Sequence, residues 1–151
     1  MQNKLVHGVV EHSNSDRPTD YFYRISVKGL IRNEKGEVLV VKEAGRTYWD
    51  LPGGGMDHGE DFDTAIAREM KEEVNLEGEF TYRIIDVDQP KYSDKNNHWQ
   101  VRLIFEIIPT TMTFAPGIDS DEIAFIHPDI LKEADEETTR LIYSYATKIT
   151  Q

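Results

Sequence analysis

The stretch from Gly54 to Leu76 reads GGMDHGEDFDTAIAREMKEEVNL and places three glutamates, Glu69, Glu72 and Glu73, at the spacing i, i+3, i+4. On a helix, side chains at this spacing lie on one face. The glutamates follow a glycine-rich turn at residues 52–55, where backbone groups can approach a ligand without side chains in the way. Hard divalent cations prefer oxygen ligands, so the stretch predicts a site for such a cation and for phosphates bound to it.

The position of the glutamates on the expected helix supports a cation site over a solvated acidic face. Counting about 100° per residue from Phe62, Glu69 falls near 340° and Glu73 near 20°, in the middle of the apolar stripe. That stripe consists of Phe62, Ala65, Ile66, Met70 and Val74. Buried carboxylates are costly unless they are paired or bound to a metal, and three together repel one another. A bound cation would resolve this conflict, and Arg68, one turn before Glu72, is expected to orient that carboxylate.

The same stretch resembles the Nudix box, whose pattern is Gly, five residues, Glu, seven residues, then Arg-Glu-apolar-x-Glu-Glu-x-Gly-apolar. The matching positions are Gly54, Glu60, Arg68, Glu69, Met70, Glu72, Glu73 and Leu76. The one departure is Asn75, where the family has glycine. This residue would follow the helix end, a position that often takes the left-handed conformation, and asparagine is the next most tolerant residue there after glycine.

The resemblance implies hydrolysis of a phosphoanhydride with Mg²⁺ or Mn²⁺ as cofactor. The expected metal set is Glu69, Glu72, Glu73, the Gly54 carbonyl and Glu122, and the expected catalytic set is Glu69, Glu72 and Arg68. Glu69 is either a further metal ligand or the general base that takes a proton from water. Glu122 belongs to an acidic cluster with Asp119 and Asp121, which is alternatively a polar turn.

Alternation of apolar and polar side chains predicts a half-buried strand at Phe22–Ile31, with Arg24, Ser26 and Lys28 on its polar side. We expect a turn at residues 33–36 and further strands at 37–42, 48–51, 79–88, 98–108 and 122–127. Two helices are expected: the one that carries the glutamates, with Asp61 as its N-cap, and a closing helix at 136–149. This irregular order favours an α+β arrangement of layers. The resemblance implies an α/β/α sandwich around a mixed β-sheet.

Composition indicates one globular domain, because the chain has 151 residues, 38% of them hydrophobic. We expect this domain to span residues 21–151, with residues 1–20 as an N-terminal arm or edge strand. The absence of cysteine excludes a disulfide scaffold, and no apolar run suggests a membrane span or a secretion leader, so we expect a cytoplasmic protein. A formal charge of −11 argues against binding of polymeric nucleic acid.

Two classes of function remain open. The first is a metal-dependent hydrolase that cleaves the pyrophosphate bond of a nucleoside diphosphate linked to another moiety, such as an NTP, a dinucleoside polyphosphate, an NDP-sugar or ADP-ribose. The second is a Nudix-type regulatory domain that binds a nucleotide or ADP-ribose without cleaving it, although such domains commonly lose box carboxylates that this chain keeps. An isoprenoid diphosphate isomerase on the same fold is disfavoured because the enzymes of that kind use a cysteine acid.

The substrate is the least determined feature. In the family, a proline beyond the box suggests ADP-ribose and a tyrosine suggests dinucleoside polyphosphates, but this chain has both Pro90 and Tyr92 in one loop. Arg46, Tyr92 and Trp99 are candidates for contacting phosphate or a base. The alternatives are a surface arginine and an ordinary polar hairpin loop. The expected partner is a small nucleotide-type molecule, and a homodimer is possible because many enzymes of this fold are dimers.

Overall fold

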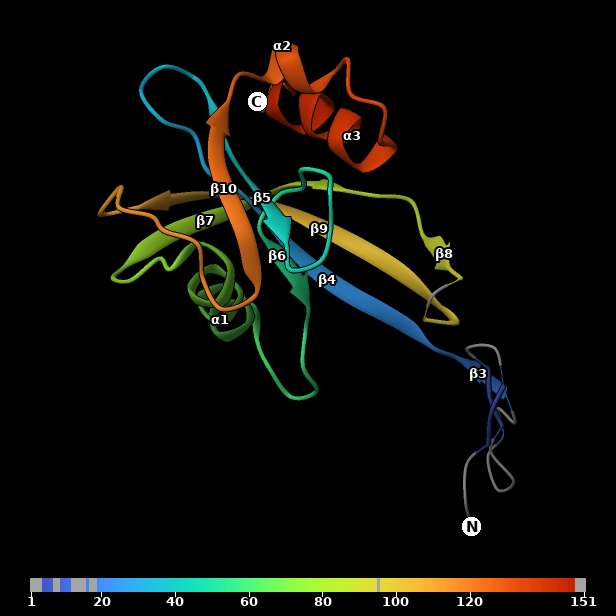
Figure 1. The fold of residues 1–151 in the computed structure, drawn as a ribbon. Coiled ribbons are helices and arrows are strands. Elements are labelled where there is room, and N and C mark those ends of the chain that lie inside the picture. The colour runs from blue at the N-terminus through green and yellow to red at the C-terminus, as the bar shows by residue number, and fades with distance from the viewer. Residues whose placement is uncertain (1–3, 7–8, 12–15, 17–18, 95, 149–151) are drawn as a thin grey trace.

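A computed structural model describes residues 4–6, 9–11, 16, 19–94 and 96–148. Its central strand is β4 (Tyr23–Leu30), which pairs antiparallel with β6 (Gly53–Gly55) on one side and parallel with β9 (His98–Pro109) on the other. Strand β9 also pairs antiparallel with β7 (Phe80–Val87) and β8 (Lys91–Ser93). The sheet is therefore mixed, as the resemblance implies (Figure 1).

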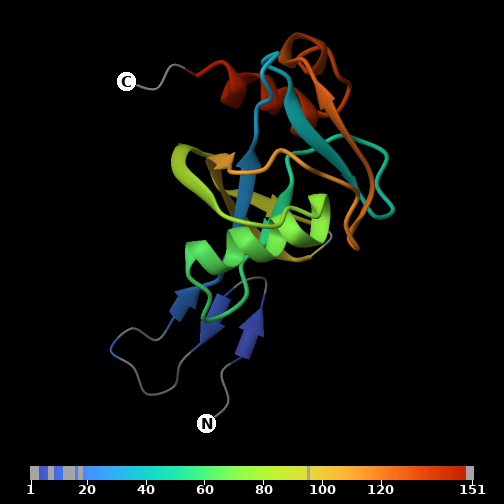
Figure 2. The same ribbon diagram turned by 90° about the vertical axis from the view of Figure 1, so that its left-hand side faces the viewer.

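Two helical layers cover opposite faces of this sheet. Helix α1 (Phe62–Val74) packs on one face against a core that includes Val27, Met70 and Phe105. Helices α2 (Pro128–Leu131) and α3 (Glu137–Ala146) lie on the other side, over a second core that includes Leu30 and Tyr145. Figure 2 shows the two layers with the sheet between them. The expected α/β/α sandwich is confirmed.

A second, two-stranded sheet is formed by β5 (Val38–Glu43) and β10 (Ser120–Ile126), which pair antiparallel. Strand β5 follows β4 after a tight turn in which the Gly36 amide donates to the Asn33 carbonyl. A segment before β10 crosses the end of α1, where the amides of Ala115, Gly117 and Asp119 donate to α1 carbonyls. These bonds satisfy backbone acceptors that a helix end otherwise leaves without partners.

Both ends of α1 follow the sequence signals. Asp61 caps the start, because its side chain accepts a hydrogen bond from the Thr64 amide at 2.8 Å. Asn75 follows the last turn with φ 54°, the left-handed conformation expected at this position. The departure of the box from glycine at Asn75 therefore keeps the same backbone geometry.

The structure corrects several expected elements. Residues 48–51 form no strand, only a single bridge between Val41 and Asp50, and the strand lies instead at the glycines of β6. Glycine has low strand propensity, and this strand depends on its pairing with β4. The short β8 and α2 were not expected, and α3 ends at Ala146. Ile149, the expected end of that helix, lies outside the described residues.

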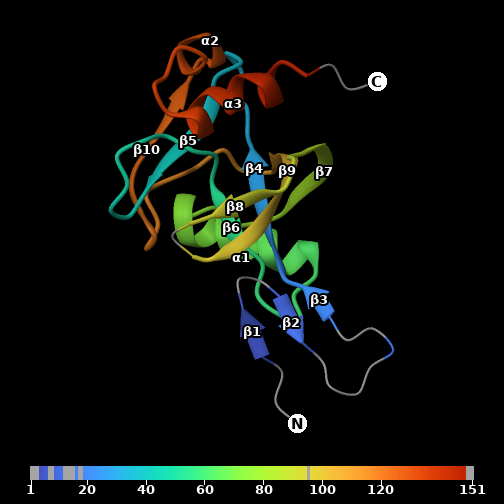
Figure 3. The same ribbon diagram turned by 90° about the vertical axis from the view of Figure 1, so that its right-hand side faces the viewer.

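The N-terminal segment forms a small antiparallel sheet from β1 (Lys4–Val6), β2 (Val9–Glu11) and β3 (Thr19–Tyr21). Figure 3 shows this sheet projecting from the main body, beyond the start of β4. Sequence analysis suggested only an arm or a single edge strand here. The division into residues 1–20 and 21–151 stays a prediction. No helix in the described ranges combines the length and the apolar character required to cross a lipid bilayer.

Candidate active site

The three box glutamates differ in burial. Glu69 and Glu73 are buried, with 6% and 4% of their surfaces exposed, and both come from the face of α1 that packs on the sheet. Burial raises the pKa of Glu69 and raises the pKa of Glu73 to about 8, because the ionised form loses its hydration. Glu72 is half-buried, with a side chain 29% exposed. The burial of Glu69 and Glu73 agrees with the helical wheel, which placed these two carboxylates within the apolar stripe.

Glycines of β6 bring the backbone close to these carboxylates. The Gly53 amide donates to Glu73 Oε2 at 2.6 Å. A Cβ atom on Gly54 would lie 3.0 Å from Glu69 Oε2, so a side chain here would crowd that carboxylate. Gly53 has φ +133°, and a Cβ there would lie 2.0 Å from the Val27 carbonyl oxygen. Gly53 therefore requires glycine, whereas a side chain on Gly54 would require the Glu69 carboxylate to move.

Arg68 connects the acidic side chains around the box. Its Nη1 donates to Glu69 at 2.8 Å and to Glu72 at 3.3 Å, and its Nη2 donates to Glu60 at 2.7 Å and to the Gly55 carbonyl at 3.1 Å. The hydrogen bond from Arg68 lowers the pKa of Glu60 to about 2. Sequence analysis predicted the contact with Glu72, but the contacts with Glu60 and Glu69 are shorter.

The residues fit a hard divalent cation by their chemistry. Three carboxylates and the backbone oxygens of the glycine strand form an all-oxygen donor set. Among the described residues, no three Asp, Glu, His or Cys side chains already enclose an ion position. In this arrangement Arg68 pairs with both Glu69 and Glu72. The raised pKa of Glu73 is the observation that favours a cation, because positive charge would offset the cost of ionising a buried carboxylate.

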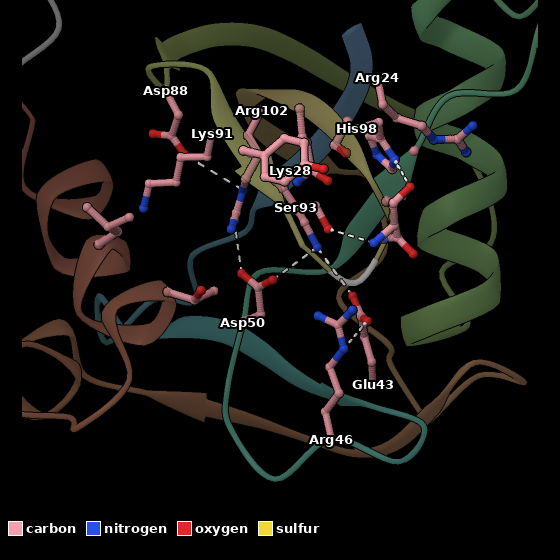
Figure 4. A pocket seen from close by; sticks show the side chains of 18 of the residues that line it. Arg24, Lys28, Glu43, Arg46, Asp50, Asp88, Lys91, Ser93, His98 and Arg102 are labelled. Atoms are coloured by element: carbon pink, nitrogen blue, oxygen red, sulfur yellow. Dashed lines mark hydrogen bonds and ion pairs between the residues drawn. The ribbon is translucent and has the colours of Figure 1, made fainter. Parts of the chain in front are cut away.

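A pocket of about 530 Å³ reaches the glycine strand β6, and no α1 residue is among the described residues that line it. It lies on the polar face of β4, the same face that α3 covers, and it reaches Gly54 and Gly55 at the sheet edge (Figure 4). Its walls come from β4, β5, β6, β8, β9, α3 and the segment between β5 and β6, and they carry basic and polar side chains. Those used below are Arg24, Lys28, Arg46, Lys91, His98 and Arg102.

The pocket floor contains a buried ion network that the sequence analysis missed. Lys28 Nζ lies 3.1 Å from Asp50 Oδ2, and Arg102 Nη2 donates to Asp50 Oδ1 at 2.9 Å. Lys28 also donates to the Gly53 carbonyl at 2.7 Å, so one lysine ties the ion network to the glycine strand. The alternation of β4 placed Lys28 on the polar side. Nothing in that pattern identified a partner 22 residues away at Asp50.

The predicted substrate residues lie in different places. Arg46 and Tyr92 line the pocket, and Arg46 is paired with Glu43 at 3.0 Å. Trp99 is not among the lining residues, and its ring packs against Tyr23 and Tyr92.

Glu122, the predicted additional metal ligand, pairs with Lys42 of β5 at 3.2 Å and is 56% exposed. In the same acidic cluster, Asp121 accepts from the Gly45 amide, and the Asp119 amide donates to the Glu72 carbonyl. Glu122 and Asp121 therefore contact β5 and the turn after it, while the Asp119 backbone contacts the carboxylate helix. The contribution of Glu122 to the metal site stays a prediction.

Comparisons with known proteins support the motif. The model of the NUDIX domain matches residues 22–145. A putative 8-oxo-dGTP diphosphatase of Bacillus subtilis is 29% identical over 99 residues, which are 66% of this chain and 63% of that protein. An RNA pyrophosphohydrolase of Actinobacillus pleuropneumoniae is 44% identical over 54 residues, 36% of this chain and 26% of that protein.

A solved structure shows the same fold. The MutT protein from Methanosarcina mazei superposes with a TM-score of 0.64 and 23% identity, covering 82% of this chain and 92% of that chain. The aligned part of this chain spans less than two thirds of the two relatives named above. The family model, in contrast, covers most of the chain, including every element of the sandwich up to α3. The chain belongs to the Nudix family.

Proposed function

We propose that this Nudix protein is a divalent-metal-dependent hydrolase that cleaves the pyrophosphate bond of a nucleoside diphosphate linked to another moiety. The observation that carries the proposal is the pair of buried carboxylates, Glu69 and Glu73, beside a glycine strand that opens into a basic pocket. Such a pair is costly without a cation, and the adjoining pocket can hold a phosphate-bearing molecule.

Each chain group has a defined task in this proposal. Glu72 and Glu73 would hold Mg²⁺ or Mn²⁺, together with the Gly54 carbonyl, and Glu69 would be a further ligand or the general base. A bound ion would neutralise phosphate oxygens and lower the pKa of a water molecule. Arg68 keeps Glu69 and Glu72 in place through its two Nη1 contacts. Glu69 can accept a proton from the attacking water if it is not required as a ligand.

The substrate side is proposed from the pocket lining. Arg46 and Tyr92 line the cavity and would contact the nucleotide, by charge and by the aromatic ring respectively. Trp99, the third sequence candidate, would act by supporting the Tyr92 ring, because the two centroids lie 5.7 Å apart. The names of the relatives add an oxidised nucleoside triphosphate and RNA to the compounds worth testing.

Glu73→Gln tests the proposal directly, because the change keeps the size of the side chain and removes its charge. We expect at least a hundredfold loss of turnover at saturating magnesium, corresponding to about 2.7 kcal/mol of transition-state stabilisation. Glu77→Gln is the matched control, since Glu77 is exposed and pairs with Lys71 outside the pocket. Full turnover by the Glu73 variant would refute the proposed role of the box.

A substrate screen should accompany this variant. Phosphate, pyrophosphate and nucleoside monophosphate are followed separately with 8-oxo-dGTP, ADP-ribose, an NDP-sugar, a dinucleoside polyphosphate and 5′-triphosphorylated RNA. The products identify both the substrate and the bond that is cleaved. Tight binding of a nucleotide without any product would instead support a regulatory domain.

A further inference from the structure

The basic side chains that line the pocket differ in whether they already have acidic partners. Four of the five lysines and arginines are paired within the protein. These pairs are Lys28–Asp50 at 3.1 Å, Arg46–Glu43 at 3.0 Å, Lys91–Glu137 at 2.7 Å and Arg102–Asp50 at 2.9 Å. The side chain of the fifth, Arg24, makes no hydrogen bond and no ion pair with any residue in the ranges that the structure describes. Arg24 is therefore the lining cation whose charge is available to a ligand.

Arg24 lies at the end of the pocket next to the carboxylate helix. It is a half-buried residue of β4, and its guanidinium lies where a side chain on Gly55 would otherwise be: a Cβ there would lie 2.3 Å from Arg24 Nε and 2.4 Å from Nη2. The carbonyl of the same glycine accepts a hydrogen bond from Arg68 of α1. Figure 4 shows the Arg24 side chain extending in the direction of α1, drawn in green. The unpaired Arg24 guanidinium therefore lies against Gly55, the second residue of the box stretch.

A second polar group without a partner lies at the same end of the pocket. His98 Nε2 is buried and has no hydrogen-bond partner among the described residues. His98 precedes Gln100 by two positions on β9, and Gln100 is the register partner of Arg24, so both side chains project from the same sheet face. Figure 4 shows Arg24 and His98 close together. Buried polar atoms normally have partners, so the unpaired His98 Nε2, next to the half-buried and unpaired Arg24 guanidinium, indicates a place for a polar ligand.

We propose that Arg24 binds a phosphate group of the substrate, next to the bond that the box cleaves. The inference rests on the proposed function. A guanidinium presents a planar fork of donors that matches phosphate oxygens, and an arginine without an internal partner gives up no existing ion pair when phosphate binds. His98 Nε2 supplies a second polar contact to the same group. Specificity for phosphorylated ligands then comes partly from the chain itself, independently of any metal.

Pyrophosphate binding measured by titration calorimetry tests this role, both with EDTA and with saturating magnesium. In Arg24→Gln, we expect the dissociation constant to rise about tenfold in both buffers, since one charge-assisted contact is lost. Gly55→Ala should have a similar effect because its Cβ would displace the Arg24 guanidinium. The double variant should bind no more weakly than Arg24→Gln, because both changes remove the same contact.

Arg83→Gln is the control, because Arg83 is 57% exposed on β7 and does not line the pocket. It should bind pyrophosphate as the unmodified protein does. The melting temperature of Arg24→Gln should also be unchanged, since Arg24 has no partner to lose. Equal affinity of Arg24→Gln and the unmodified protein, or no pyrophosphate binding by the unmodified protein, would overturn the inference. The arm with EDTA separates it from the proposed function, which the Glu73 variant tests by turnover.

Discussion

Replacing Lys28 by methionine should destabilise the metal-free protein strongly. The lysine side chain is 5% exposed, and its Nζ contacts Asp50, the Gly53 carbonyl and the Leu51 carbonyl within 3.3 Å. Its pKa is raised despite burial, chiefly by the charge of Asp50, so the buried group is a cation. Methionine keeps most of the apolar volume but removes the charge, which leaves Asp50 with Arg102 as its remaining buried cationic partner.

The magnitude follows from the cost of separating a buried ion pair. Removing one partner of such a pair costs about 3–5 kcal/mol, because the other charge stays buried with less compensation than before. In a domain of this size each kcal/mol lowers the melting temperature by about 2–4 °C, so the expected decrease is roughly 6–20 °C. Urea unfolding in EDTA, followed by circular dichroism, measures the free energy directly, and calorimetry measures the melting temperature.

Two comparisons make this prediction specific. Lys35→Met is the matched control, because Lys35 is exposed in the turn before β5 and should change stability by less than about 0.5 kcal/mol. The double variant Lys28→Met/Asp50→Asn should lose less unfolding free energy than the two single variants lose together. In the double variant, neither position carries a charge that has lost its partner from the other. A loss below about 1 kcal/mol in Lys28→Met would refute the reasoning, because a surface-like ion pair costs no more than that.

Two further predictions concern backbone geometry and pH. Asn75→Ala should lower the unfolding free energy by about 1 kcal/mol and Asn75→Gly should not, because residue 75 has φ 54° and alanine disfavours the left-handed region; urea denaturation of both variants measures this, and equal losses would contradict it. Burial alone would raise the pKa of Asp50, but the charges of Lys28 and Arg102 outweigh it and lower the folded pKa below 3.8. Ionised Asp50 therefore stabilises the protein above about pH 4, and this contribution is lost as pH falls through the folded pKa. The stability difference between the unmodified protein and Asp50→Asn should therefore shrink below about pH 4, and a pH-independent difference in urea midpoints would count against this assignment.

Features encoded by local periodicity were predictable from the sequence. Helix α1 with its Asp61 cap, the left-handed Asn75 and the alternating strands β4 and β9 all follow from neighbouring residues. The burial of Glu69 and Glu73 was also predictable, because a helical wheel relates positions within one element. These features required no knowledge of how distant segments meet.

Features that depend on contacts between distant segments were not predictable. Strand β6 is made of glycines, and it becomes a strand only by pairing with residues 26–28 of β4. Lys28 read as part of a solvated strand face, but Asp50 and the cover of α3 make that face the floor of a pocket. Arg24 could be assigned to the same face, but the absence of an internal partner for it is a property of the folded chain. Propensity and alternation describe single elements, whereas residues from six different elements line the pocket.

The glycine strand explains how a helix on one face of the sheet can serve a pocket on the other. Strand β6 is an edge strand of the sheet, and each missing Cβ leaves room for a different neighbour. At Gly53 the neighbour is the backbone of β4, at Gly54 it is the Glu69 carboxylate from α1, and at Gly55 it is the Arg24 guanidinium. Alanine at the three positions should therefore cause three distinct defects, in folding, in the carboxylate site and in phosphate binding. A strand with ordinary side chains would separate the carboxylates from the pocket. The glycines of β6 instead allow the carboxylates and the pocket to meet at one edge of the sheet.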